Sequence, residues 1–547
     1  MTAAEHKKPA VQRWVFWPAA VVVTIFVAFA LLLPDATEAV FASVQSSIVG
    51  NFNWYYVLLS AFFVVFCLWM GFSRFGNIKL GKDDDEPEFS VASWFSLLFA
   101  AGMGIGLVFY GVSEPLSHFA QPRPGVTGDS NQLAQQALSQ TYLHWGVHAW
   151  SIYVVIGLAL AYAIHRRGRP VSIRWALEPI LGRRVRGLWG HAIDVIALVG
   201  TLFGVATSLG LGVLQISAGL ESIGLVESSE LLNVGIIIAI SALALASVLS
   251  GVTKGMKLLS NANLVLAAAL VLFVLIVGPT QFLLRDFVQS LGHYLQNVVG
   301  LTFNVSAYTG TKGESWQGSW TTFYWAWWIS WSPFVGIFIA RISRGRTVRQ
   351  FVTGVILVPT LITFVWFSVL GGTALYFQLQ GKGGLVAADG SVNVENALFA
   401  ALGQLPGGAI LVVGALILIA IFFITSADSG SLVMSMIATG GDIEPKAWIR
   451  VFFMSITATL AIALLLSGGL DALKTAAIII ALPFSVVMLA ICWSTVVAFS
   501  HELRAYDKAE RSALLDHIGD YYGLEVEQPI QRGIFENPHW KGFRQKK

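Results

Sequence analysis

Charged residues and cysteines are both scarce in this 547-residue sequence. Asp, Glu, Lys and Arg make up 12% of the residues, about half the share in a soluble chain, whereas 56% are hydrophobic. The two cysteines, Cys67 and Cys492, lie in apolar runs, so a disulfide-stabilised secreted scaffold is excluded. The formal net charge of +3 is too small to indicate nucleic-acid binding. Recurrent long apolar runs instead predict an all-α polytopic membrane protein, and they exclude an outer-membrane barrel.

Twelve apolar runs are long enough to be membrane spans. They cover about residues 15–33, 55–73, 91–112, 141–164, 189–214, 232–250, 260–284, 317–340, 350–373, 408–437, 449–467 and 475–500. The first run lacks a small-residue cleavage site, which favours a retained helix over a signal peptide.

The distribution of Lys and Arg predicts the orientation of these spans. With the N-terminus inside, the external segments contain only Arg123, Arg285, Lys312, Lys382 and Lys474. All other Lys and Arg residues then face the cytoplasm, as the positive-inside rule requires, so we expect both termini to be cytoplasmic. The external segment 286–303 mixes apolar and polar residues and is expected to form an amphipathic helix at the interface.

Three glycines alternate in the middle of the third span, at Gly102, Gly104 and Gly106. Glycine weakens a helix because it tolerates other backbone conformations. Backbone groups freed at membrane depth must line a cavity or meet a ligand, and broken helices of this kind form the midplane sites of transporters. Close packing of helices through small residues is the alternative explanation.

Aromatic residues form a stripe in the eighth span. Tyr324, Trp327, Trp328 and Trp331 share one helix face, two turns inside the helix, and clustered aromatic faces attract quaternary ammonium groups. The fourth span carries a second set, formed by Trp145, Trp150 and Tyr153. A layer of bulky packing residues remains the alternative.

The tenth span contains hydroxyl groups at membrane depth. Phe422, Thr425 and Ser426 stand at i, i+3 and i+4, and the two hydroxyls are suitable ligands for sodium. Bonding of each hydroxyl to its own helix is the alternative. Asp428 follows two residues later, and an ionisable residue here indicates a functional role, a partner on another helix or a water-lined mouth.

Four segments together resemble the betaine/carnitine/choline transporter family. They are the glycine motif at 102–106, the segment 144–153, the Trp-rich stretch 325–333 and the stretch 425–429, in that order along the chain. The resemblance extends from the first span to about residue 500. It implies a solute carrier of a bacterial inner membrane that works by alternating access, and not an enzyme.

The resemblance also implies a leucine-transporter-like fold with inverted five-helix repeats in a homotrimer. The expected organisation is a cytoplasmic N-terminal tail (1–13), two peripheral helices (14–89), a first repeat (90–284), an external amphipathic helix and loop (285–315), a second repeat (316–500) and a cytoplasmic C-terminal tail (501–547). The external helix would help to join the subunits.

Binding residues follow from the same likeness. The trimethylammonium group would be held by Trp145, Trp150, Tyr153, Trp327, Trp328 and Trp331, beside Gly102, Gly104 and Gly106. A coupling sodium ion would bind the backbone carbonyls of Ala100 and Met103 together with Phe422, Thr425 and Ser426. No other cofactor is expected. Choline-type members have an aspartate where Gly106 stands, so Gly106 favours the zwitterion glycine betaine.

The sequence leaves other functions open. A proton-coupled choline carrier and a carrier of carnitine or dimethylsulfoniopropionate would share this architecture. A channel would need a pore lined by polar or charged rings. A membrane enzyme would need convergent ionisable residues, and His144 and His148, at i and i+4, have no third metal ligand apparent in the sequence.

Overall fold

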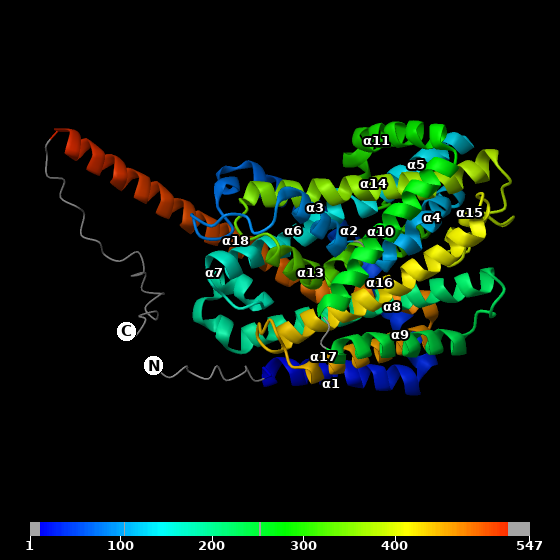
Figure 1. The fold of residues 1–547 in the computed structure, drawn as a ribbon, viewed down its shortest axis with the longest axis horizontal. Coiled ribbons are helices and arrows are strands. Elements are labelled where there is room, and N and C mark those ends of the chain that lie inside the picture. The colour runs from blue at the N-terminus through cyan, green and yellow to red at the C-terminus, as the bar shows by residue number, and fades with distance from the viewer. Residues whose placement is uncertain (1–10, 103, 251–252, 523–547) are drawn as a thin grey trace.

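The computed structural model describes residues 11–102, 104–250 and 253–522, and within them the secondary structure is helical (Figure 1). An isolated antiparallel bridge joins Lys79 to Thr347. The α-helices are α1 (Arg13–Leu32), α2 (Pro34–Phe72), α3 (Val91–Gly102), α4 (Ile105–Ala120), α5 (Ser130–Trp145), α6 (Val147–Ala161), α7 (Glu178–Leu181), α8 (Leu188–Ser222), α9 (Glu230–Ser250), α10 (Thr253–Val277), α11 (Thr280–Thr302), α12 (Gly310–Gln317), α13 (Phe323–Arg341), α14 (Val348–Gln380), α15 (Ala397–Gly403), α16 (Gly408–Ala438), α17 (Ala447–Leu466) and α18 (Gly469–Tyr522).

Each of the twelve predicted spans coincides with one or two of these helices. Among the described residues, nine helices are long and apolar enough to cross a membrane. The remaining predicted spans fall on α3 and α4, on α9 and on α13. The all-helical polytopic fold is therefore confirmed. The orientation and the division into two repeats stay predictions.

The fourth span differs from the prediction because it is interrupted at Gly146. This residue has φ −94° and ψ −134° and separates α5 from α6. A Cβ at this position would lie 2.5 Å from the carbonyl oxygen of Tyr142 and 2.8 Å from the ring of Phe364. Trp145 therefore ends one helix, while Trp150 and Tyr153 belong to the next.

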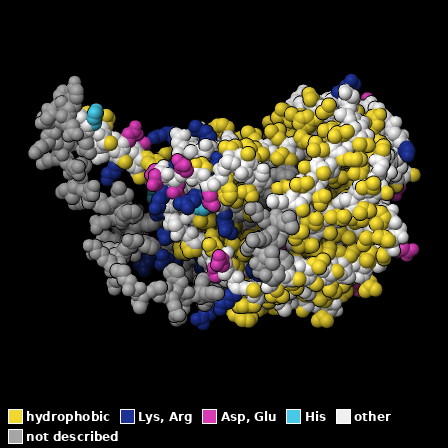
Figure 2. Space-filling view, viewed as in Figure 1, with side chains coloured by type: hydrophobic (Ala, Val, Ile, Leu, Met, Phe, Trp, Pro, Cys, Tyr) yellow, Lys and Arg dark blue, Asp and Glu magenta, His cyan; other side chains and the backbone are white. Residues whose placement is uncertain are grey.

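Helix α13 lies in the middle of the bundle. It packs against α6, α8 and α18, and α8 packs in turn against α16 and α17. A side chain of α13 is therefore surrounded by helices from distant parts of the sequence. The face of the body seen in Figure 2 is largely hydrophobic, as expected for contact with lipid. Charged side chains gather where α18 leaves the body.

An ionic network occupies this charged end. The guanidinium of Arg166 donates to Asp83 in the loop before α3, at 2.9 Å, and to Glu502 of α18, at 2.8 Å. Tyr506 of α18 donates to the same carboxylate of Asp83. The hydrogen bonds from Arg166 and then from Tyr506 hold the pKa of Asp83 below its usual value. The network thus fastens α18 to the rest of the charged end.

The predicted amphipathic segment forms most of α11. This helix packs against α5 and α14 through buried residues that include Leu283 and Tyr294. Four other apolar residues of α11 form an exposed stripe: Leu284, Val288, Leu295 and Val299.

Candidate functional site

The third span is interrupted where the glycines predict. Helix α3 ends at Gly102 and α4 begins at Ile105, with Gly104 in an extended conformation at φ −132° and ψ −175°. Gly102 and Ala100 lie in the last turn of α3. Met103, a predicted sodium ligand, lies outside the described residues.

Two of these glycines allow indole rings to approach the backbone. A Cβ on Gly106 would lie 2.2 Å from Cη2 of Trp327, and a Cβ on Gly104 would lie 2.9 Å from Cη2 of Trp331. Real side chains do not tolerate the first of these distances. Trp331 also approaches α8, where a Cβ on Gly204 would be 3.0 Å from its Cδ1. Small residues on two helices therefore make room for the rings of α13.

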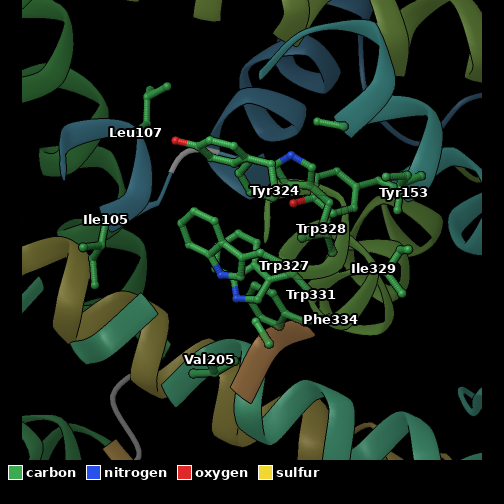
Figure 3. Packing of buried hydrophobic residues seen from close by; sticks show 14 of the residues in the cluster. Ile105, Leu107, Tyr153, Val205, Tyr324, Trp327, Trp328, Ile329, Trp331 and Phe334 are labelled. Atoms are coloured by element: carbon green, nitrogen blue, oxygen red, sulfur yellow. The ribbon is translucent and has the colours of Figure 1, made fainter. Parts of the chain in front are cut away.

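All six predicted aromatic residues belong to one connected cluster. Trp327 stacks on Trp328 with ring centroids 4.8 Å apart and an interplanar angle of 16°. Trp145 meets Trp328 edge-on at 4.9 Å. The outer members are joined through three more ring contacts: Trp331 with Trp327, Tyr153 with Trp328, and Trp150 with Tyr153. In Figure 3 the rings carried by α13 gather opposite the α4 segment that bears Ile105 and Leu107.

Some polar atoms of this cluster are buried without a partner among the described residues. Among the six predicted residues they are Nε1 of Trp327, Nε1 of Trp331 and the hydroxyl of Tyr153, and the hydroxyl of Tyr110, whose ring contacts Trp327, is also without a partner. Nε1 of Trp328, in contrast, donates to the carbonyl oxygen of His144 at 2.9 Å. Buried donors without acceptors are costly, so the free donors are suited to a ligand that carries an acceptor such as a carboxylate.

The sequence analysis did not identify Glu114, which organises one end of the cluster. Its fully buried carboxylate accepts hydrogen bonds from Nε1 of Trp145 at 2.7 Å and from the hydroxyl of Tyr324 at 2.5 Å. His144 and His118 bond to the same carboxylate at 2.7 Å and 3.2 Å. Glu114 thereby connects α4, α5 and α13. An acidic residue near the end of an apolar run was the only signal in the sequence.

The same residues supply the third ligand that the sequence analysis did not find for His144. Among the described residues, Glu114, His118 and His144 form a group that could hold a metal, with ligand atoms within 4.8 Å of one another. Their nitrogen and oxygen atoms already form hydrogen bonds with each other. Through Glu114, the group is also bonded to Trp145 and Tyr324. His148 lies apart and bonds to Thr302 of α11.

The predicted sodium ligands of the tenth span lie on α16. The hydroxyl of Thr425 donates to the carbonyl oxygen of Ile421 at 2.9 Å and accepts from Nδ2 of Asn263 on α10 at 3.2 Å. Phe422 is buried, whereas Thr425 and Ser426 are partly buried. No hydrogen bond among the described residues joins these hydroxyls to the break in the third span. The sodium site stays a prediction.

Asp428 has a partner on the neighbouring helix. Its carboxylate lies 2.5 Å from the guanidinium of Arg450 on α17. The side chain of Asp428 is 2% exposed and that of Arg450 is 17% exposed. Of the roles left open by the sequence, the structure supports a pair between two helices.

Comparison with known proteins identifies the family. The model of the betaine/carnitine/choline family transporters matches residues 14–504. The chain belongs to this family. It is therefore a multi-pass membrane transporter and not an enzyme.

Curated relatives extend over most of the chain. An uncharacterized transporter of Mycobacterium tuberculosis is 50% identical over 501 residues, covering 90% of this chain and 84% of the relative. The glycine betaine transporter OpuD of Bacillus subtilis is 46% identical over 497 residues, covering 91% and 96%. A glycine betaine transporter of Acinetobacter baylyi is 44% identical over 492 residues, covering 88% and 73%.

Proposed function

We propose that this protein imports glycine betaine together with sodium. The observation that carries the substrate assignment is the aromatic cluster, in which rings of α5, α6 and α13 meet and two rings of α13 lie against the break of the third span. Aromatic faces stabilise a desolvated quaternary ammonium by about 2 kcal/mol or more. The names of the relatives from Bacillus subtilis and Acinetobacter baylyi support the same solute class.

Two features favour a zwitterion over choline. The three buried donors on Trp327, Trp331 and Tyr153 are suited to a carboxylate, which choline lacks. Gly106 carries no side chain, and a Cβ at this position would enter the ring of Trp327. The site thus offers no carboxylate at Gly106 to neutralise a solute with a net positive charge. Carnitine and dimethylsulfoniopropionate also contain a carboxylate and are the alternative solutes.

Sodium coupling rests on the two hydroxyls of α16. Thr425 and Ser426 offer neutral oxygen atoms, which are hard ligands suited to sodium. Replacing both residues by Ala is expected to abolish the sodium dependence of uptake. The variant Ser435→Ala removes a hydroxyl from the same helix, about two and a half turns beyond Ser426, and is the matched control. Unchanged sodium dependence in the double variant would remove these residues from the sodium site.

In the proposed cycle, sodium binds first and orders the break in the third span. The solute then places its methylated nitrogen among the aromatic rings and its carboxylate near the free donors. One group of helices rocks against the other and exposes the site to the cytoplasm. A homotrimer is part of this proposal, and the exposed apolar stripe of α11 is the surface that would join the subunits. Cross-linking through cysteines introduced at Val288 tests this contact.

The function is tested by uptake into proteoliposomes. Purified protein is supplied with labelled glycine betaine or choline under a sodium gradient, a proton gradient or no gradient. The proposal predicts accumulation of glycine betaine with the sodium gradient alone. Choline accumulation driven by protons would support the proton-coupled choline carrier instead.

A further inference from the structure

Lys474 holds a positive charge against the aromatic residues beside the proposed solute site. It is partly buried near the start of α18, the end predicted to be external. Its ammonium lies 5.4 Å from the ring centroid of Trp320 and 5.6 Å from that of Phe323. Among the described residues, no carboxylate lies within ion-pair distance of this ammonium. Aromatic faces are therefore its close partners, an arrangement that a quaternary ammonium would also use.

The rings next to Lys474 continue into the aromatic cluster. Phe323 stacks on Trp327 with centroids 5.4 Å apart and an interplanar angle of 17°. Trp327 then stacks on Trp328. Trp320, the second ring under the ammonium, is 4.5 Å from the ring of His118. The ammonium of Lys474 thus lies one ring beyond the residues proposed to hold the solute.

Three carboxylates act on Lys474 from a distance, but none of them forms an ion pair with it among the described residues. Asp471, Glu395 and Glu114 are the acidic residues that act on Lys474 electrostatically. Asp471 is exposed to solvent, which screens its field. Glu114 already accepts hydrogen bonds from Trp145 and other donors. The ammonium of Lys474 is thus not neutralised by a direct ion pair, and it adds a positive potential of its own beside the cluster, which a substitution of Lys474 removes.

We propose that Lys474 is a specificity-determining residue that disfavours solutes with a net positive charge and admits zwitterions. This inference rests on the proposed function. A solute cation on Trp327 would lie on the order of 10 Å from the ammonium of Lys474. At an effective dielectric constant near 20, the repulsion between two like charges at this distance lowers the affinity for the cation about tenfold. The carboxylate of glycine betaine offsets this repulsion because it adds an attraction to the same ammonium. Choline has no such group.

The test compares Lys474→Met with Lys474→Arg in proteoliposomes. Lys474→Met keeps an apolar stem of similar length but removes the charge, and Lys474→Arg retains the charge. The measured quantities are the KM of labelled glycine betaine and the inhibition constant of unlabelled choline. We expect Lys474→Met to lower the inhibition constant of choline about tenfold while the KM of glycine betaine changes less than about threefold. Lys474→Arg should resemble the wild type.

Two outcomes would overturn the inference. In the first, Lys474→Met shifts choline and glycine betaine by the same factor, as a purely structural role would. In the second, the inhibition constant of choline does not change. If Lys474→Met proves unstable, Lys474→Gln replaces it. The Kd values of both solutes are then measured by fluorescence titration of purified Lys474→Gln and of the wild type. Failure of the wild type to transport glycine betaine would instead contradict the proposed function.

Discussion

A methyl group added at Gly106 should displace a ring of the solute site. In Gly106→Ala, the new Cβ would lie 2.2 Å from Cη2 of Trp327. The ring cannot easily move aside, because it is stacked between Phe323 and Trp328 at interplanar angles of 17° and 16°. Overpacking of a filled interior costs about 1–3 kcal/mol. Strain of this size in the bound state raises the Kd of glycine betaine between about fivefold and 150-fold.

The Kd is measured by titrating purified protein with glycine betaine while tryptophan fluorescence is recorded. Thermal unfolding measures the stability of the same variants. Gly414→Ala is the matched control because Gly414 also lies within a membrane helix, and a Cβ there would meet nothing within 4 Å. Its Kd should equal that of the wild type. The double variant Gly106→Ala/Trp327→Phe has a smaller ring at the clash. Its loss of binding free energy for glycine betaine should therefore be less than the sum of the losses in the two single variants.

Two results would refute this reasoning. A wild-type Kd in Gly106→Ala would show that the ring of Trp327 does not need the bare backbone. An equal loss in Gly414→Ala would show that the effect arises from adding any methyl group to a membrane helix.

Three further predictions concern charged groups. Glu114→Ala leaves several buried donors without their acceptor. The free energy of unfolding should therefore fall by about 3 kcal/mol or more, and the Kd of glycine betaine should rise. A stability equal to that of the wild type would contradict the role given to this carboxylate. Asp428→Ala leaves Arg450 as a partly buried unpaired charge and should cost about 3–5 kcal/mol, with partial recovery when Arg450 is also replaced by Met. The lowered pKa of Asp83 means that its carboxylate stabilises the fold above its unfolded pKa of about 3.9 and loses this contribution as the pH falls through the folded pKa. Because Asp83 is largely exposed, Asp83→Asn should reduce stability at pH 7 by at most about 1 kcal/mol, and thermal unfolding should show this difference vanish at low pH.

The sequence predicted those features of the fold that local patterns determine. Apolar runs located the helices, and the glycine motif located the interruption between α3 and α4. The interruption at Gly146 was not predicted, because a single glycine is often accommodated within a helix. Here the carbonyl oxygen of Tyr142 and the ring of Phe364, from a helix far away in the sequence, leave no room for a Cβ at this position.

The aromatic site was predictable in its members but not in its supports. Rings at helical spacing indicated Trp327, Trp328 and Trp331 without any knowledge of the partner helices. Glu114 and Lys474 could not be assigned in this way, because their importance comes from contacts between helices. Likewise, the partner of Asp428 is defined only by the packing of α16 against α17.

The central claim is that the aromatic cluster recognises the positive charge of a methylated ammonium. Equilibrium binding of glycine betaine and of its carbon isostere 3,3-dimethylbutanoate to the purified protein tests this most directly, because the two differ only in the charged nitrogen. Cation–π stabilisation of about 2 kcal/mol predicts that glycine betaine binds about thirtyfold more tightly. Equal affinities would contradict the account, since the cluster would then recognise only the shape of the solute and its carboxylate.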